Sequence, residues 1–497
     1  MAMLLAFACL VIFVTCLLSY YKRGGAQYNL PPGPKKLPII GNFHQLSRLP
    51  HQSLWDLSKK HGPVMYLRLG SLPTVVVSSL GTARDVLKTN DLDFCSRPHL
   101  AATDTFSYEC SDVTFSAYGE HWREMRKTSI LELFSQKKVD SFHVIREEEI
   151  AEVMRTMPSS LAAADGRVNV SSMVVNLTSR IVYRLALGMR FREGREVEKS
   201  RIHGIVREMQ ELLASSFVAD FFPAFGWMDR MTGLQAKLER TRKKLDDFLE
   251  ETIAERVHAG REEAEDLLDV YLRIHKQTGQ LSKHYVKALI TDLLAAGTET
   301  ATATIVWAMT ELARNPHLML KAQDEVRAVA GSRGKVQESD LPHLPYLKAV
   351  IKETLRLHSP VPLLLPRISV RRSRVGGHDV PANTTVFVNV WGISRDPNVW
   401  EDPETFNPER FMGSSIDYKG HNFELLPFGG GRRICAGMNL GVRKVEIVLA
   451  SMLYCFDWKL PGGVRREDVN MEEAPGIVAH KRVDLELLAV KHVVPLS

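Results

Sequence analysis

The chain has 497 residues, of which 45% are hydrophobic and 25% are charged. These are ordinary values for a globular protein and exclude extensive disorder. The formal net charge of +6 is spread along the chain and not clustered, which argues against nucleic-acid binding. The six cysteines include no CxxC motif and no cysteine–histidine cluster that suggests zinc, and they are too few for a disulfide framework. This usage fits a reducing compartment.

Residues 1–21 form an apolar segment without a charged side chain, and Lys22 and Arg23 follow it directly. A helix of this length crosses a bilayer core of about 30 Å. The alternative, a cleavable signal peptide, would need a basic start, a shorter apolar stretch and a small-residue cleavage site, and none of these is clear. We therefore predict a retained, single-pass transmembrane signal anchor. Because positive charge follows the span, the rest of the chain is expected in the cytosol.

A proline-rich stretch follows the anchor. Pro31, Pro32 and Pro34 fix φ and disfavour helix, so residues 22–41 are predicted to be a basic, stiff hinge. No linker or repeat interrupts residues 42–497, which predicts one large domain, mainly α-helical with small β-sheets. Strands are expected in residues 64–79, with a turn at Gly70, and again after Pro360, whereas helical periodicity dominates in between.

One predicted helix carries polar groups in its apolar middle. It starts near Lys283, runs for about thirty residues and ends at Asn315 and Pro316. Residues 296–300 of this helix read AGTET, and a glycine with an acid–hydroxyl pair lowers helix stability. The hydroxyl of Thr300 can bond a carbonyl one turn back and open the helix locally. The alternative is a threonine-rich contact between helices.

A possible ion pair lies in the ETLR sequence at residues 353–356. Glu353 and Arg356 are three residues apart and therefore share one helix face. Such pairs are usually solvated surface bridges of little energetic value. Their position before the predicted strands, with Arg410 of FNPERF (residues 406–411) available, favours a buried structural triad.

Near the C-terminus, residues 428–437 read FGGGRRICAG and precede an apolar, helical stretch. No lysine stands where a phosphate-binding P-loop needs one, and the glycine spacing differs from that of a dinucleotide-binding loop. A cysteine phosphatase would need an arginine where Gly441 stands. Two interpretations remain. One is a thiolate held by backbone donors at a helix N-terminus, a group that haem iron binds, and the other is a glycine-rich turn with an inert cysteine.

These motifs resemble those of the cytochromes P450. Phe428, Gly431, Arg433, Cys435 and Gly437 match the family's Phe-x-x-Gly-x-Arg-x-Cys-x-Gly signature. AGTET resembles its oxygen-activation motif, ETLR its Glu-x-x-Arg pair and FNPERF the segment that supplies a third charge. FELLPFGGGRRICAG and LPYLKAVIKETLRLH are most similar to the plant microsomal group called A-type. The resemblance covers nearly the whole chain.

The resemblance implies a haem-thiolate monooxygenase that holds haem b (iron protoporphyrin IX), with Cys435 as the metal ligand. It implies that Glu299 and Thr300 help to deliver protons to dioxygen, although Ala301 follows where many members carry another hydroxyl. The haem propionates are expected to meet Trp122, Arg126, Arg367 and Arg433, with Arg97 as a weaker candidate. Glu353, Arg356 and Arg410 are expected to be structural.

The segments that the resemblance places around the substrate are apolar, so the expected substrate is a lipophilic small molecule. The candidate contact residues are Thr103, Phe115, Phe217, Phe222, Ala296, Val361, Leu365 and Ile477. Related plant enzymes act on terpenoids, alkaloids, phenolics or aldoximes, and the sequence fits all four classes. Hydroxylation is the expected reaction, and some members of the family instead catalyse dehydration, ring expansion or C–C coupling.

The chain contains no flavin or nicotinamide fingerprint, so its electrons must come from another protein. The resemblance implies an NADPH–cytochrome P450 reductase that docks on the basic face around Cys435, with cytochrome b5 as a second donor and O2 as co-substrate. It also implies the endoplasmic reticulum membrane, with lipid contact and a cytosolic catalytic domain. Two alternatives are a haem-binding membrane protein without turnover and a steroid-binding scaffold. The Glu299–Thr300 pair disfavours the haem-binding protein without turnover, and the intact cysteine loop disfavours the steroid-binding scaffold.

Overall fold

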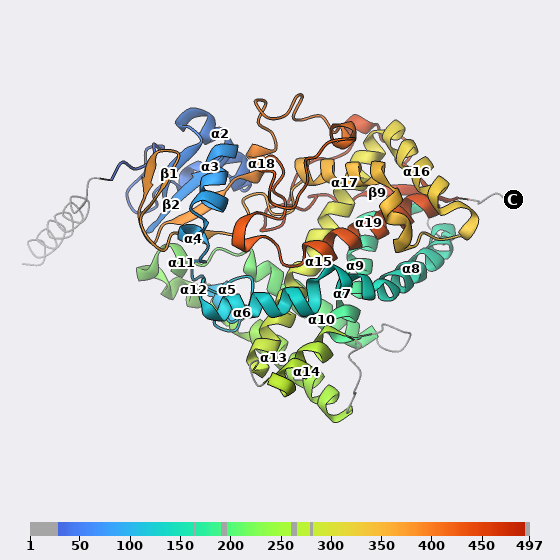
Figure 1. The fold of residues 1–497 in the computed structure, drawn as a ribbon, viewed down its shortest axis with the longest axis horizontal. Coiled ribbons are helices and arrows are strands. Elements are labelled where there is room, and N and C mark those ends of the chain that lie inside the picture. The colour runs from blue at the N-terminus through green and yellow to red at the C-terminus, as the bar shows by residue number, and fades with distance from the viewer. Residues whose placement is uncertain (1–27, 164, 190–195, 260–265, 279–281, 493–497) are drawn as a thin grey trace, which may run out of the picture.

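The structure is a computed structural model that describes residues 28–492, except 164, 190–195, 260–265 and 279–281. The predicted anchor at residues 1–21 and the start of the predicted hinge lie outside the described residues. Within the described part of the chain, no helix combines the length and the apolar character needed to cross a membrane. Helices make up most of the molecule, and short strands lie towards opposite ends of it (Figure 1). The predicted fold class is therefore confirmed for the globular part.

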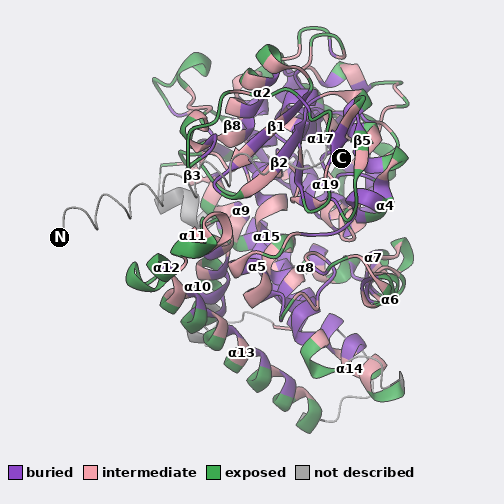
Figure 2. Ribbon diagram, turned by 90° about the vertical axis from the view of Figure 1, so that its left-hand side faces the viewer, coloured by how far each residue is buried: buried purple, intermediate pink, exposed green. Residues whose placement is uncertain are grey.

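The helices of the first half of the chain are α2 (Pro50–His61), α3 (Leu80–Arg84), α4 (Asp91–Phe94), α5 (Ala101–Phe106), α6 (Glu120–Ser129), α7 (Gln136–Ser141), α8 (His143–Ala163), α9 (Val170–Leu187), α10 (Glu196–Leu213), α11 (Val218–Phe221) and α12 (Trp227–Met231). Those of the second half are α13 (Leu234–Ala259), α14 (Leu267–Thr278), α15 (Lys283–Arg314), α16 (Pro316–Ala330), α17 (Pro345–Leu357), α18 (Val390–Ile393) and α19 (Met438–Cys455). Exposed residues follow the outer face of α13, whereas buried residues dominate around α17 and α19 (Figure 2).

The strands of the described residues form three sheets. The largest has the order β1 (Val64–Leu69), β2 (Leu72–Val77), β7 (Thr385–Val388) and β4 (Arg367–Ile368). The second has the order β3 (Arg167–Asn169), β9 (Glu486–Lys491) and β8 (Phe456–Lys459), and the third pairs β5 (Ser373–Val375) with β6 (His378–Val380). Strands β1 and β2 are antiparallel, with Val64 opposite Val77, and the turn between them uses Gly70 at φ 60°. Both predicted groups of strands are thus present.

Helix α15 runs through the centre of the molecule and packs against α9 and α19 (Figure 1). It begins after Ser282, whose hydroxyl accepts a hydrogen bond from the Tyr285 N–H. It ends where Asn315 donates its side-chain amide to the Glu311 carbonyl at 2.9 Å, and Pro316 opens α16. Proline lacks an N–H and is favoured at a helix start, which explains this boundary. The predicted end of the helix is confirmed.

The described part of the predicted hinge is fixed to the globular body. The Pro32 carbonyl accepts a hydrogen bond from the Tyr66 N–H in β1 at 2.9 Å. The Asn29 N–H donates to the Asp379 carboxylate in β6 at 3.0 Å, and the Asp379 N–H donates to the Asn29 carbonyl at 2.8 Å. Gly33 lies so close to β1 that a Cβ atom there would approach the Tyr66 carbonyl oxygen to 2.0 Å.

Candidate functional site

Two glycines give the loop that carries Cys435 its shape. Gly429 and Gly431 have φ angles of 70° and 66°, in the left-handed region that residues with a Cβ atom rarely adopt. A Cβ atom at Gly431 would also come within 2.2 Å of the Leu87 carbonyl oxygen. The Cys435 N–H donates to the Phe428 carbonyl at 3.0 Å, and α19 begins three residues later. The glycine-rich decamer therefore forms a tight loop that ends at a helix N-terminus.

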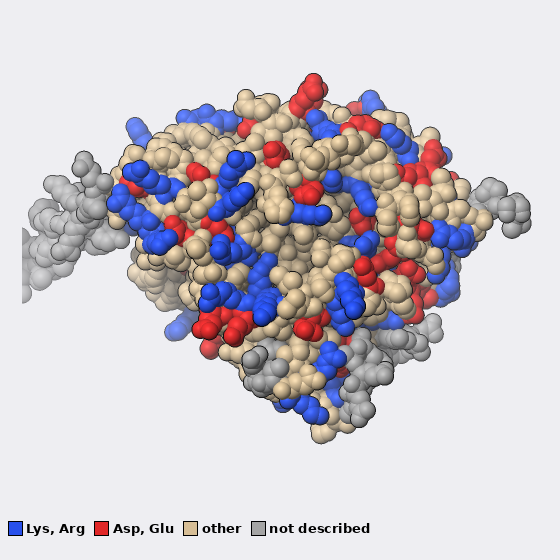
Figure 3. All heavy atoms as spheres, in the orientation of Figure 1, with Lys and Arg blue, Asp and Glu red and all other residues tan. Residues whose placement is uncertain are grey.

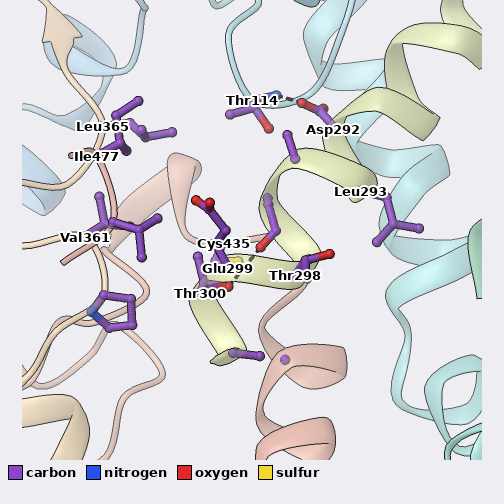
Figure 4. Close-up of a pocket in the computed structure, with 18 of the residues that line it drawn as sticks. Thr114, Asp292, Leu293, Thr298, Glu299, Thr300, Val361, Leu365, Cys435 and Ile477 are labelled. Carbon is purple, nitrogen blue, oxygen red and sulfur yellow. Dashed lines mark hydrogen bonds between the residues drawn. The ribbon is translucent and has the colours of Figure 1, made fainter. Parts of the chain in front are cut away.

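Cys435 faces an internal cavity of about 700 Å³. Although the loop lies deep in the protein, the residue has exposed surface because its side chain borders this cavity. Figure 4 shows Val361, Leu365 and Ile477 on one side of the cavity and Leu293 of α15 on another. A cavity of this size can accommodate a large cofactor or a drug-sized ligand.

Helix α15 presents the AGTET residues to the cavity. The Thr300 hydroxyl donates to the Ala296 carbonyl one turn back at 2.9 Å, so the bond anticipated from the sequence is present. The Glu299 carboxylate lies 3.5 Å from Nε2 of His480, a residue that also lines the cavity. Both side chains are about one-third exposed, and both residues line the cavity. His480 is not predictable as a site residue from the sequence, because it stands in an irregular segment without a recognisable motif.

Five arginines line the cavity, and four of them, Arg97, Arg126, Arg367 and Arg433, share a buried environment, whereas Arg207 is exposed on α10. Burial lowers the pKa of all four guanidinium groups, that of Arg433 to about 10. Most of their hydrogen bonds go to carbonyl oxygens. Arg126 donates to the Ile434 carbonyl at 2.7 Å, and Arg433 donates to those of Cys95 and Ser116 at 2.6 Å each.

Arg97, the weaker candidate from the sequence, belongs fully to this cluster. It donates to the carbonyls of Leu365 and Pro366 at 2.9 and 2.8 Å. Trp122, in contrast, does not line the cavity. Its indole N–H donates to the Val113 carbonyl at 2.9 Å, and its ring centroid lies 4.2 Å from the Arg433 guanidinium carbon. Trp122 therefore packs against Arg433 without reaching the cavity itself. A sequence motif alone does not distinguish these two positions.

These residues fit haem b. Carbonyl oxygens do not neutralise buried guanidinium groups, and Asp91, 3.3 Å from Arg367, is one of the few carboxylates beside them. The two propionates of a haem would supply the missing negative charge at this edge of the cavity. Burial raises the pKa of the Cys435 thiol, while the Gly437 N–H and Arg126 act against this shift. A metal ion that binds the sulfur favours the thiolate over the thiol. The site is therefore that expected of a haem-thiolate protein.

Comparisons with known proteins agree with this class. The sequence model of the family described as Cytochrome P450 matches residues 31–485. The chain is 45% identical to cytochrome P450 71B35 of Arabidopsis thaliana, over 96% of this chain and 97% of that protein. It is 46% identical to strychnine-11-hydroxylase of Strychnos nux-vomica, over 93% and 91% of the two chains. A solved zebra fish cytochrome P450 with abiraterone has a TM-score of 0.75 at 25% identity, and the match covers 90% of this chain and 100% of that one.

The chain therefore belongs to the cytochrome P450 family and is a P450 monooxygenase. The family implies the use of haem and O2. The relatives from Arabidopsis and Strychnos are plant proteins, which confirms the resemblance to the plant A-type group.

The structure brings Glu353, Arg356 and Arg410 together in the interior. The Arg356–Glu353 pair is bidentate, with distances of 2.7 and 2.8 Å, and both side chains are fully buried. Arg410 lies 3.3 Å from the same carboxylate. Arg356 also donates to the carbonyls of Ser394 and Pro403 at 2.7 Å each. These bonds connect α17 to the segment that precedes the Cys435 loop.

Of the predicted substrate contacts, Phe115, Ala296, Val361, Leu365 and Ile477 line the cavity. Thr103, Phe217 and Phe222 do not, so these three predictions are corrected. Thr103 is buried and donates its hydroxyl to the Leu100 carbonyl at 3.0 Å. Phe217 belongs to the main hydrophobic core, and Phe222 packs against Phe43, with ring centroids 6.0 Å apart.

Helices α9 and α10 supply cavity residues that the sequence analysis missed, among them Ser179, Tyr183, His203, Val206 and Gln210. Gln210 also donates to the Ala295 carbonyl of α15 at 3.1 Å. Asp292 of α15 fixes the opposite wall, because its carboxylate accepts hydrogen bonds from the N–H groups of Val113 and Thr114 at 3.0 and 3.3 Å (Figure 4). Burial raises the pKa of Asp292.

Lys444 is a buried cation beside the AGTET groove. It projects from α19, lines the cavity and donates its ammonium to the Gly297 carbonyl of α15. Burial, together with the charge of Arg146, lowers the pKa of Lys444 to about 7. The sequence does contain a signal that Lys444 is buried. It stands one helical turn from Leu440 and from Val448, on the apolar face of its helix.

Proposed function

We propose that this P450 inserts one oxygen atom from O2 into a lipophilic plant specialised metabolite, with electrons from an NADPH-dependent reductase at the endoplasmic reticulum membrane. The observation that carries the proposal is the position of Cys435, whose side chain faces a cavity of about 700 Å³ between the arginine cluster and the Glu299–Thr300 groove. When bound, the haem iron supplies the reductive activation of dioxygen.

The protein side chains hold the cofactor at two places. Cys435 is proposed to bind the iron through its sulfur, with the Gly437 N–H stabilising the negative charge. Arg97, Arg126, Arg367 and Arg433 are proposed to bind the propionates, since all four guanidinium groups line the cavity. The buried Glu353–Arg356–Arg410 triad is proposed to stabilise the haem-binding core and to take no part in the chemistry.

Glu299 and Thr300 are proposed to hold and move protons on the other side of the cavity. Thr300 can rotate its hydroxyl away from the Ala296 carbonyl towards the cavity, since an O–H group rotates to suit its partners. Glu299 is proposed to exchange protons with water in the cavity, because about one-third of its side chain is exposed and the residue lines the cavity. His480, 3.5 Å away, can share this proton with Glu299. Together they form a short proton path to the groove.

The cavity walls favour a lipophilic substrate that carries a polar group. Val361, Leu365 and Ile477 form an apolar wall, while His203 and Gln210 place polar atoms at the α10 side. A relative named strychnine-11-hydroxylase is consistent with an alkaloid, one of the four classes expected from the sequence. The test is reconstitution of the membrane-bound protein with reductase, NADPH and ¹⁸O₂, followed by mass spectrometry of products from each class. A product that gains one ¹⁸O atom supports the proposal, and oxidation without incorporation of ¹⁸O from O2 contradicts it.

The electron donor is proposed to dock on the surface over the Cys435 loop. Exposed basic residues stand in the segments that contact this loop and in the loop itself: Lys88, Arg123, Lys127, Lys419 and Arg432. Figure 3 shows basic side chains on this face, with acidic ones interspersed. Opposite charge on a flavoprotein would increase the association rate, and salt would weaken it.

Charge reversal tests the docking surface. Arg123→Glu combined with Lys127→Glu is expected to slow reduction by the reductase by about tenfold, as is typical for electrostatic steering. Reduction by dithionite should remain unchanged, because this small reagent needs no docking surface. Lys59→Glu on α2 is the matched control. Equal rates in all three proteins would contradict the proposed surface.

A further inference from the structure

A histidine, an aspartate and a cysteine meet at the surface around α5. His99 precedes the helix, Asp104 lies in it and Cys110 follows it. The Cys110 sulfur lies 3.0 Å from Oδ1 of Asp104 and 3.8 Å from Nδ1 of His99, and His99 Nδ1 lies 3.2 Å from Oδ2 of Asp104. The three ligand atoms all lie within 4.8 Å of one another. These residues form no recognisable metal-binding motif in the sequence, because the chain brings them together only by folding around α5.

The turn that carries Cys110 is strained. Tyr108, Glu109 and Cys110 have φ angles of 54°, 60° and 57°, in the left-handed region that residues with a Cβ atom rarely adopt. The surrounding contacts hold it in place. The Tyr108 hydroxyl donates to Asp246 at 3.0 Å, and the Cys110 N–H donates to the Ser107 hydroxyl at 2.9 Å. Backbone strain of this kind often marks a functional position, and here it directs the Cys110 sulfur towards His99 and Asp104.

The spacing of the three atoms fits a tetrahedral ion. With Zn–S near 2.3 Å and Zn–N or Zn–O near 2.1 Å, ligand atoms at tetrahedral angles are separated by about 3.6 Å for S–N or S–O and about 3.4 Å for N–O. With Oδ1 of Asp104 as the carboxylate ligand, the observed separations are 3.8 Å (S–N), 3.0 Å (S–O) and 3.3 Å (N–O), within about 0.6 Å of these values. Ca²⁺ and Mg²⁺ prefer six or more oxygen ligands, whereas Zn²⁺ accepts this mixture of sulfur, nitrogen and oxygen.

The local charge also favours a cation. Asp220 accepts a hydrogen bond from the Ala101 N–H at 2.9 Å, at the start of the same helix. Burial raises the pKa of Asp220 to about 6, and the neighbouring carboxylates of Asp229 and Asp104 add to this effect. A bound cation would relieve this repulsion. Because 70% of the His99 side chain is exposed, a water molecule can reach the fourth position on the ion.

We propose that His99, Asp104 and Cys110 bind one Zn²⁺ ion, with water as the fourth ligand. On binding, the Cys110 thiol loses its proton to solvent and the sulfur forms a bond to zinc, so no oxidant or reductant is needed. The ion clamps the 108–110 turn to α5. Because the cavity residues Val113 and Phe115 follow this turn directly, zinc restricts the segment that borders the cavity. This proposal is independent of the proposed substrate and reductase.

The experiment is alkylation of the full-length haem-loaded protein by iodoacetamide, with and without ZnCl2, with each cysteine quantified by peptide mass spectrometry. Zinc should slow alkylation of Cys110 by about tenfold or more, because a metal-bound sulfur is a poor nucleophile. The half-buried Cys455 is the internal control, and MgCl2 is the control ion. His99→Ala and Asp104→Asn should each abolish most of the protection.

Isothermal titration with ZnCl2 supplies the second measurement, because surface histidines can bind zinc without forming this site. The unaltered protein should bind one more ion than either His99→Ala or Cys110→Ser. The proposal is contradicted if these stoichiometries are equal. It is also contradicted if zinc fails to protect Cys110, or protects it equally in the His99→Ala protein.

Discussion

Replacement of the buried Lys444 by methionine should stabilise the protein at neutral pH. Lys444 is 1% exposed, and burial lowers its pKa to about 7 from an ordinary value of 10.5. The unfolded chain therefore binds more protons than the folded one between pH 7 and 10.5. A buried lysine with this shift lowers the free energy of unfolding by about 4 kcal/mol at pH 7, and the effect decreases as the pH rises to 10.5.

The hydrogen bond from Lys444 to the Gly297 carbonyl offsets part of this cost. A bond from a charged donor contributes about 1.5–3 kcal/mol, so Lys444→Met should gain about 1–3 kcal/mol at pH 7. For a chain of this length, 1 kcal/mol corresponds to about 1 °C in the melting temperature, so the expected rise is about 1–3 °C. Most of the gain should be lost by about pH 10, because Lys444 is neutral in the folded protein there and the unfolded chain, with a pKa of 10.5, has begun to lose its proton as well.

The assay is thermal unfolding of the haem-loaded protein at several values of pH between 7 and 10, followed by circular dichroism. Lys283→Met, at the exposed start of α15, is the matched control and should not change the pH dependence. A methionine variant that is less stable than the unaltered protein at pH 7 would refute the reasoning. A gain in stability that does not change with pH would refute it equally.

Two further substitutions test the groups on either side of the haem-binding core. Thr300→Ala removes the hydroxyl beside the groove and should raise the ratio of NADPH consumed to product formed by about tenfold, the effect of losing one proton-transfer group; an unchanged ratio would count against its role. Glu353→Ala leaves Arg356 buried and uncompensated and should cost about 3–5 kcal/mol, with loss of bound haem, as measured by urea unfolding and haem absorbance. Glu409→Ala, at an exposed neighbouring position, is the control for Glu353→Ala, and equal stability of the two variants would contradict the burial argument.

Local signals in the sequence predicted much of the fold. The strands at residues 64–69 and 72–77 follow from a β-rich stretch around Gly70, and the end of α15 follows from Asn315 and Pro316. The conformation of the Cys435 loop follows from its glycines, because a positive φ is a property of single residues. In each case the information lies within a few neighbouring residues.

The predictions that the structure does not support concern residues whose surroundings depend on tertiary contacts. Phe217 and Phe222 have the apolar surface of cavity residues, but whether such a side chain faces a cavity or the core depends on distant segments. The sequence predicts Arg97 only as a weaker candidate for the same reason, since an isolated arginine is usually exposed and only the fold places it at the cavity. The contact between His99 and Cys110 likewise depends on the turn after α5. The left-handed residues of this turn include no glycine, so the sequence contains no signal that predicts the turn.

The most direct test of the account is the carbon monoxide difference spectrum of the reduced, haem-loaded protein, with Cys435→Ser compared with the unaltered chain and with Cys455→Ser. We predict that the unaltered chain and Cys455→Ser show the spectrum of thiolate-ligated haem and oxidise substrate. Cys435→Ser should lose both properties, because a serine hydroxyl cannot supply the thiolate. Retention of that spectrum and of turnover in Cys435→Ser would contradict the central claim that the sulfur at position 435 binds the iron.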